Sequence, residues 1–155
     1  MTKAISIGNY HIRDFRPEDV EALHEILRDP EVMRYIEPPF TRVQTAAFLQ
    51  VNGLDTLHRI YALADADDRV IGQIIFHPYV GDAWEIGWIL GQSHWGRGLA
   101  TAVTETLVER CREMGVKRCV IECDPAQTVT RHIAKKCGFS RTEDRDGLAC
   151  YELTL

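Results

Sequence analysis

Apolar residues recur at three- and four-residue intervals along several stretches of the chain, which predicts amphipathic helices. Pro17 suits the first turn of one helix, and capping-box spacing at Thr41 predicts the start of another, which Gly53 can close in a left-handed conformation. Gly115 can end the longest helix in the same way. The expected helices cover residues 17 to 28, 41 to 53, 99 to 114 and 127 to 136.

Alternating apolar and polar residues predict strands between these helices. The turn at residues 65 to 68 is short, which favours an antiparallel hairpin. The strand after the longest helix lies beyond a crossover connection, so it should run parallel to the strand before that helix. The expected strands cover residues 10 to 15, 58 to 64, 69 to 77, 84 to 90, 117 to 123, 140 to 144 and 149 to 154, the last two around Asp146-Gly147.

Composition places the chain among ordinary globular proteins. Its 155 residues fit one domain, and 45% hydrophobic with 26% charged residues excludes a disordered chain. A net charge of −5 argues against nucleic acid and suits a cationic partner. No apolar run is long enough to span a bilayer. The five cysteines lack CxxC spacing and the six histidines lack a zinc-binding pair, so we expect reduced thiols, a cytoplasmic protein and no metal.

A glycine-rich turn joins the strand over residues 84 to 90 to the longest helix. Gly96 and Gly98 lack the Cβ atoms that would keep a ligand away from the backbone. The first turn of the helix presents unpaired N–H groups at the positive end of the helix dipole. Such a junction can bind a phosphate group, and three classes of phosphate ligand compete for it.

Spacing argues against two of these classes. Gly91 and Gly96 have the interval of a mononucleotide P-loop, but Arg97 and Gly98 follow where a lysine and a magnesium-binding hydroxyl are required. A dinucleotide turn fits the strand and the helix, yet Thr101 occupies its third small position and only one βαβ unit is visible. The third class is an acyl-coenzyme A turn.

From Glu85 to Phe139 the chain resembles the GNAT N-acetyltransferases, particularly the branch that acetylates the N-termini of ribosomal proteins. Residues 95 to 100 match the coenzyme A signature of that family, and residues 124 to 139 match a second segment in which Gln127 replaces an asparagine. Weaker matches near the N-terminus extend the likeness over nearly the whole chain. The resemblance implies one N-acetyltransferase domain over residues 1 to 155, with a mixed α/β sheet of about seven strands and about four helices on both faces.

The resemblance also implies acetyl-coenzyme A as the co-substrate. Backbone N–H groups of the glycine turn would hold its pyrophosphate, and the end of the preceding strand would contact its pantetheine arm. Gln127 would contact the pantetheine or the departing sulfur. The implied binding residues are Trp88, Ile89, Leu90, Trp95, Gly96, Arg97, Gly98, Leu99, Ala100, Thr101 and Gln127.

Acetyl transfer to an amine requires a group that removes a proton from the amine. Glu122 is the expected base, directly or through water, because some family members have a catalytic glutamate at this place; Glu85 is the competing carboxylate. The tyrosine that some relatives use as an acid is Ala134 here. Thr130 takes the place of a serine proposed as the acid in others, and direct departure of the thiolate is the alternative.

The acceptor is expected to be a primary amine on a small molecule or a protein N-terminus. Candidates for the wall of its site are Tyr35, Glu37, Trp84 and Glu85, among which Glu37 would attract a cation. We expect no nucleic acid or membrane partner, and the family resemblance allows a homodimer. The alternative function is a non-catalytic sensor that binds acyl-coenzyme A, motivated by the departures from the family pattern.

Overall fold

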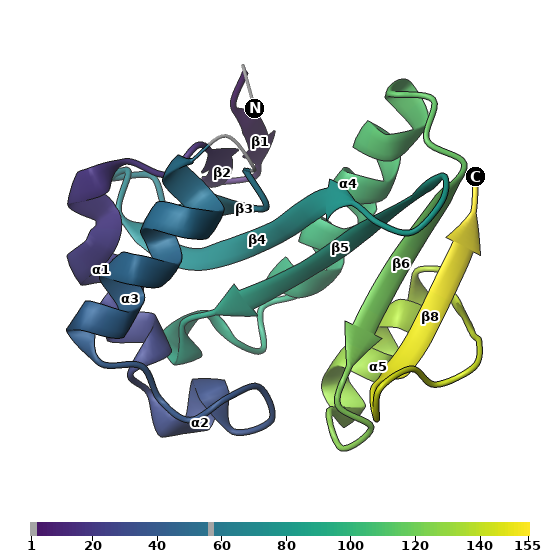
Figure 1. Cartoon of the computed structure of the whole chain (residues 1–155). Coiled ribbons are helices and arrows are strands. Elements are labelled where there is room, and N and C mark those ends of the chain that lie inside the picture. Colours follow the sequence, from purple (N-terminus) through teal and green to yellow (C-terminus); the bar gives the residue numbers. More distant parts are fainter. Residues whose placement is uncertain (1–2, 56–57) are drawn as a thin grey trace. The chain divides into compact units, whose positions relative to one another are not determined.

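The computed structural model describes residues 3 to 55 and 58 to 155. Within these residues, eight strands form one mixed sheet in the order β1-β2-β3-β4-β5-β6-β8-β7 (Figure 1). The chain divides into two compact units, Met1–Ile75 with Trp88–Leu99 and Phe76–Gly87 with Ala100–Leu155. Strands β4 and β5 contribute residues to both units. The single domain remains a prediction, whereas the mixed α/β sheet is confirmed.

Antiparallel strands form the sheet of the first unit. β1, β2, β3 and β4 pair in this order, and the predicted hairpin between β3 and β4 is confirmed. Ile60 pairs with Ile75 and Ala62 with Gln73, so these four side chains share one face. The strands are β1 (Ile5–Ile7), β2 (Tyr10–Arg13), β3 (Ile60–Ala64) and β4 (Val70–Pro78), of which β4 continues into the second unit.

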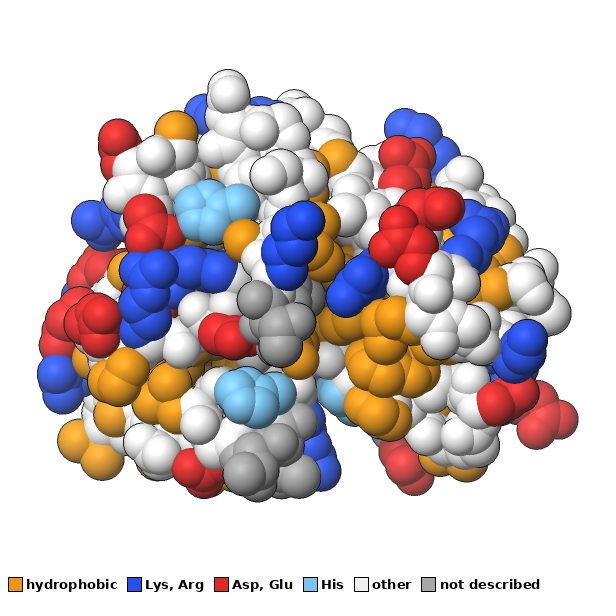
Figure 2. Space-filling model, turned by 90° about the horizontal axis from the view of Figure 1, so that it is seen from above, with side chains coloured by type: hydrophobic (Ala, Val, Ile, Leu, Met, Phe, Trp, Pro, Cys, Tyr) orange, Lys and Arg blue, Asp and Glu red, His pale blue; other side chains and the backbone are white. Residues whose placement is uncertain are grey.

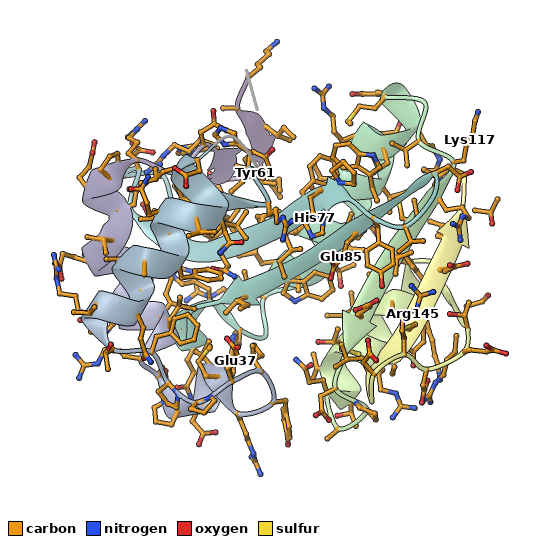
Figure 3. The ribbon with its side chains drawn as sticks, viewed as in Figure 1. Glu37, Tyr61, His77, Glu85, Lys117 and Arg145 are labelled. Carbon is orange, nitrogen blue, oxygen red and sulfur yellow. The ribbon has the colours of Figure 1, made fainter. Side chains whose placement is uncertain are left out.

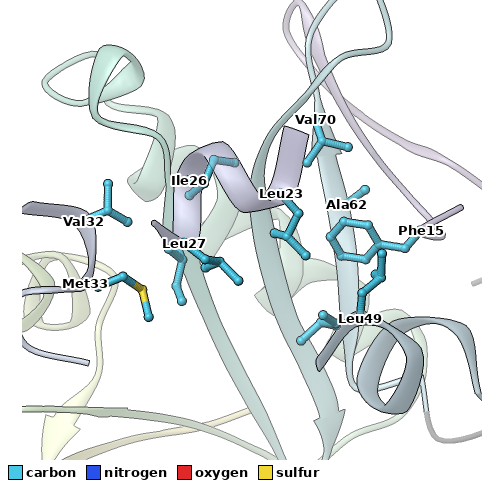
Figure 4. Close-up of a cluster of buried hydrophobic side chains, with 11 residues drawn as sticks. Phe15, Leu23, Ile26, Leu27, Val32, Met33, Leu49, Ala62 and Val70 are labelled. Atoms are coloured by element: carbon cyan, nitrogen blue, oxygen red, sulfur yellow. The ribbon is translucent and has the colours of Figure 1, made fainter. Parts of the chain in front are cut away.

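Three helices follow β2 and contribute side chains to the hydrophobic core of the first unit. A 3-10 turn at Pro17–Asp19 leads into α1 (Val20–Leu27), and α2 (Pro30–Met33) and α3 (Arg42–Leu49) follow. α1 ends within the expected range of residues 17 to 28, and the side chain of Asp29 caps α2 by accepting from Glu31 N–H. The buried cluster drawn in Figure 4 comprises Phe15, Leu23, Ile26, Leu27, Val32, Met33, Leu49, Ile60, Ala62, Val70 and Ile89.

The predicted start of α3 agrees with the structure, whereas its predicted end does not. The capping box is confirmed, because Thr41 Oγ1 accepts from Gln44 N–H at 3.1 Å and Gln44 Oε1 accepts from Thr41 N–H at 2.8 Å. The left-handed closure at Gly53 is wrong, since Gly53 lies inside a π-helical turn, Gln50–Leu54. The glycine is needed because there is no room for a side chain: a Cβ at this position would lie 2.9 Å from Leu49 Cδ1 and 3.2 Å from Phe15 Cδ2.

The second unit contains the crossover. β5 pairs with β6 in parallel, as predicted, and β6 pairs antiparallel with β8. Gly115 has a φ of +77° after the end of α4, as its predicted role requires. The first strand of the last hairpin is only two residues long, and β1 and α2 were not predicted. The elements are β5 (Ala83–Leu90), α4 (Leu99–Glu113), β6 (Arg118–Cys123), α5 (Thr128–Lys136), β7 (Ser140–Arg141) and β8 (Ala149–Thr154).

Candidate active site

The glycine turn has a geometry suited to an anion. Gly96 and Gly98 have φ values of +72° and +75°, and a Cβ at either would meet nothing within 4 Å. Left-handed glycines on both sides of Arg97 make the kind of backbone concavity in which successive N–H groups bind anions. α4 begins at Leu99 and runs for 15 residues, so its N-terminal dipole adds a positive potential. These residues fit the pyrophosphate of coenzyme A.

Two side chains fix the turn to the rest of the first unit. Trp95 Nε1–H donates to the carbonyl oxygen of Leu90 at 3.0 Å, which ties the turn to the end of β5. The Tyr10 hydroxyl lies 3.1 Å from His94 Nδ1, and the two rings meet edge to face. Burial and the charge of Arg97 lower the pKa of His94, so its ring is neutral near pH 7. The positive potential at the turn therefore comes from the backbone and Arg97.

At the end of β5 the backbone, rather than the side chains, is available to a ligand, because the side chains pack against the protein. Ile89 and Leu90 are buried and Trp88 is half-buried. Gly72 on β4 allows a close approach, since a Cβ there would lie 2.7 Å from the carbonyl oxygen of Ile89. Binding of the pantetheine arm through the main chain of residues 88 to 90 stays a prediction.

In the second unit, both candidate bases lie on one face of the strands. Glu85 pairs with Val120, and Glu122, two residues further along β6, pairs with Cys150. Paired residues and residues two apart share a face, so both carboxylates project to the same side. We call this side of β5, β6 and β8 the carboxylate face.

The helices of the second unit cover the opposite side. The buried thiols of Cys111 in α4 and Cys119 in β6 interact, and Arg131 Nε of α5 donates to the Tyr151 hydroxyl of β8 at 3.1 Å. Cys119 and Tyr151 alternate with the residues of the carboxylate face. The helices α4 and α5 thus leave that face to other partners.

Glu85 is held by a histidine. His77 Nε2 lies 2.9 Å from Glu85 Oε2, and His77 Nδ1 lies 2.8 Å from the carbonyl oxygen of Pro78 (Figure 3). Both partners are hydrogen-bond acceptors, so both contacts are satisfied together when the two ring nitrogens carry protons. The Glu85 carboxylate therefore already has a side-chain partner, the His77 ring.

Glu122 instead accepts a hydrogen bond from a neutral group, the hydroxyl of Tyr79. This hydrogen bond, together with burial, raises the pKa of Tyr79 to about 12. Arg145 Nη1 donates to the same hydroxyl at 3.3 Å, and its guanidinium carbon lies 5.6 Å from the centre of the Tyr79 ring. The Tyr79 hydroxyl thus lies between a carboxylate and a guanidinium.

The two remaining candidates for the donor chemistry lie around the start of α5. Gln127 precedes the helix, and its Oε1 accepts from Asp124 N–H at 2.9 Å, which leaves its NH₂ group without a protein partner in the described ranges. Thr130 is half-buried, and its hydroxyl has no hydrogen-bond partner among residues 3–55 and 58–155. Ala134 is fully buried.

The candidates for the acceptor wall come from separate places. Tyr35 and Glu37 are exposed on the segment after α2, in the first unit. Trp84 lies in the second unit on the side of β5 opposite Glu85, and its ring centre is 4.8 Å from that of Phe76. Only Glu85 belongs to the carboxylate face.

Sequence reasoning did not identify His77, Tyr79 or Arg145. Each is a single polar residue near a strand end or in a loop, with no motif around it, and each meets its partner only in the folded protein. A glycine within a strand pattern is the signal that would have found Gly72.

Two features are absent from the part of the chain that the structure describes. It contains no group of three His, Cys, Asp or Glu side chains placed to hold a metal ion. None of its helices is long and apolar enough to cross a membrane. On the face drawn in Figure 2, lysine and arginine side chains are interspersed with acidic ones.

Comparison with known proteins identifies the family. Residues 10–140 match the model of the acetyltransferase (GNAT) domain. An uncharacterized N-acetyltransferase of Bacillus subtilis, YnaD, is 31% identical over 133 residues, which cover 84% of this chain and 78% of YnaD.

Solved structures agree with this result. A GNAT-family acetyltransferase from Bacillus anthracis superposes with a TM-score of 0.85 at 25% identity, covering 98% of both chains. RimL, a ribosomal L7/L12 α-N-protein acetyltransferase in complex with coenzyme A, shares the fold with a TM-score of 0.83 at 19% identity, covering 99% of this chain and 98% of RimL. The chain belongs to the GNAT acetyltransferase family and is an acyltransferase.

Proposed function

We propose that this protein transfers the acetyl group of acetyl-coenzyme A to a primary amine by direct attack in a ternary complex. The observation that carries the proposal is the pair of left-handed glycines, Gly96 and Gly98, in open space at the start of α4 within a GNAT domain. Five free cysteine thiols suit a cytoplasmic enzyme, and a homodimer is part of the proposal.

The donor is held mainly by backbone groups in this proposal. N–H groups of residues 96 to 101 bind the pyrophosphate, and residues 88 to 90 bind the pantetheine arm through their main chain. The free NH₂ group of Gln127 is available to the pantetheine or the departing sulfur. RimL, which shares the fold, has been solved with coenzyme A. When bound, acetyl-coenzyme A supplies an activated thioester carbonyl.

Glu122 acts as the base. The amine nitrogen forms the new C–N bond as the C–S bond breaks, the sulfur leaves with the bonding electron pair, and Glu122 takes the proton of the amine directly or through water. Glu85 is less suited to this role because its contact with His77, at 2.9 Å, occupies the carboxylate. The partner of Glu122 is a neutral phenol, which can move aside without leaving a charge unpaired.

The protonation of the leaving thiolate has two routes. The Thr130 hydroxyl, in the first turn of α5, has no hydrogen-bond partner among the described residues and can donate to the sulfur. Alternatively the thiolate departs directly and takes its proton from water. A Thr130→Val variant separates them: a slower chemical step supports Thr130 as the acid, and an unchanged rate supports direct departure.

In this proposal Glu85 lines the acceptor site on the carboxylate face, beside Glu122. Trp84 projects from the opposite side of β5, so its expected place in the same wall does not fit this geometry. Tyr35 and Glu37 stay separate candidates for contacts with the acceptor. The exposed carboxylate of Glu37 would attract an ammonium group. Matched variants test the wall: Glu37→Gln should raise KM for a verified acceptor, while Glu18→Gln, another exposed carboxylate, should leave it unchanged.

A turnover assay tests the function. Purified protein is mixed with acetyl-coenzyme A and a panel of amino acids, polyamines, aminoglycosides and N-terminal peptides, and release of the coenzyme A thiol is followed. Thiol release that depends on the acceptor, with an acetylated product found by mass spectrometry, supports the proposal. Tight binding without any acceptor-dependent release would contradict it and favour an acyl-coenzyme A sensor.

Two glycine variants test the donor site. Gly98→Ala and Gly115→Ala each place a Cβ on a left-handed residue in open space, so each should cost about 1–2 kcal/mol of stability. Only Gly98→Ala should weaken the binding of coenzyme A in calorimetry. If the two variants bind coenzyme A with equal affinity, the pyrophosphate does not bind at the glycine turn.

A further inference from the structure

Arg145 is held in place beside Glu122 by a tight turn. Its backbone N–H and carbonyl both bond Leu148, at 3.0 and 2.9 Å, around Asp146 and Gly147, whose φ values are +53° and +79°. Such two-residue turns are the stable closures of β-hairpins. Stacking on the Tyr79 ring and the bond to the Tyr79 hydroxyl then orient the guanidinium.

The neighbouring basic side chains already have carboxylate partners. Arg118 binds Asp82 and Glu152 at 2.9 and 2.8 Å, and His77 binds Glu85. The other arginine of the last hairpin, Arg141, is paired with Asp144 at 3.1 Å.

Arg145 differs from these residues. Within the described residues its guanidinium has no carboxylate partner, although it is exposed and keeps most of its N–H donors free. Glu122 likewise has no cationic partner within hydrogen-bond distance in those ranges; its contact is the Tyr79 hydroxyl. One unpaired anion and one unpaired cation therefore lie on either side of a single hydroxyl group.

We infer that the acceptor is a zwitterionic amine, a free amino acid whose carboxylate binds Arg145 while its amino group faces Glu122. This inference rests on the proposed function and names the class of acceptor. An arginine fork binds a carboxylate through two parallel hydrogen bonds, which also fixes the direction of the ligand.

The geometry suits a small ligand of this kind. Glu122 and Arg145 are linked through one oxygen atom, so they are separated by the span of two hydrogen bonds. The amino and carboxylate groups of an amino acid are a few bonds apart and can reach both side chains. A polyamine would place an additional cation near Arg145, and an amino acid amide would leave the guanidinium without its anion.

The test compares each of several amino acids with its own amide in the thiol-release assay. The free acid should have the higher kcat/KM, by roughly 10- to 100-fold, as expected for a hydrogen-bonded charge pair. Arg145→Ala should reduce this preference by about tenfold or more, and Arg145→Lys should reduce it less. Arg110→Ala, an arginine on α4, should leave it unchanged.

The possible outcomes distinguish failure of the zwitterion inference from failure of the proposed acetyltransferase function. Equal or better turnover of the amides or of polyamines overturns the zwitterion inference and leaves the acetyltransferase function standing. A preference for free acids that survives in Arg145→Ala also overturns it, because the carboxylate is then bound elsewhere. Absence of turnover with every amine, despite native circular dichroism, overturns the proposed function as well.

Discussion

Replacing Glu122 with glutamine should lower the pKa of Tyr79, which is raised to about 12 in the native protein. The first cause of that raised pKa is the hydrogen bond to the Glu122 carboxylate, and repulsion between the carboxylate and a phenolate adds to it. A neutral amide removes both effects and leaves burial and Arg145, whose charge acts in the opposite direction. The pKa should therefore fall toward the ordinary tyrosine value of about 10.

The change is large enough to see at one pH. A phenol with a pKa of about 12 is roughly one-tenth ionised at pH 11, whereas one with a pKa near 10 is about nine-tenths ionised there. Absorbance at the tyrosinate band, measured against Tyr79→Phe in the same background, isolates Tyr79 from the other tyrosines. Circular dichroism at the same pH verifies that each variant is folded.

The same pKa predicts a loss of stability in alkali. Because the pKa of Tyr79 is raised on folding, its contribution to stability is complete below pH 10 and is lost between about pH 10 and 12. A two-unit shift corresponds to about 2.7 kcal/mol at most, and solvent screening of this partly exposed side chain reduces it to about 1 kcal/mol. If Glu122→Gln and the native protein titrate alike, the Tyr79–Glu122 contact is wrong and the case for Glu122 weakens.

Three further predictions concern stability, each measured by urea denaturation. Asp19→Asn should cost about 3 kcal/mol because it breaks the buried pair with Arg13 at 2.8 Å, while Glu25→Gln in an exposed pair should cost under about 0.5 kcal/mol; equal losses would contradict this. Gly53→Ala should cost about 1–2 kcal/mol because its Cβ would lie 2.9 Å from Leu49 Cδ1, and a stabilised variant would show that the core yields. Thr41→Ala should cost about 1 kcal/mol through loss of the capping box, and an unchanged midpoint would refute that estimate.

Local rules predicted much of the fold. The capping box at Thr41, the parallel strand beyond the long helix and the left-handed Gly115 each follow from a few neighbouring residues, and all are confirmed. Gly53 is an exception to these local rules. The sequence suggests that it ends a helix in a left-handed conformation, whereas in the structure a side chain at this position would be too close to Phe15.

The surroundings of the carboxylates were not predictable in the same way. The sequence suggests Glu122 and Glu85 as alternative bases, but it does not show which side chains contact them. Their partners, Tyr79 and His77, lie at the end of β4 and directly after it, and they reach these carboxylates only in the folded protein. Side-chain partners across a sheet depend on tertiary packing, which periodicity does not encode.

The most direct test of the account is the amine-dependent release of coenzyme A thiol by Glu122→Gln. With a verified acceptor, kcat should fall by about 100-fold or more and its pH dependence should change, since a general base contributes on this scale. Glu113→Gln, an exposed carboxylate on α4, should behave like the native protein. A Glu122→Gln variant with native kcat and a native pH profile would contradict the assignment of Glu122 as the base.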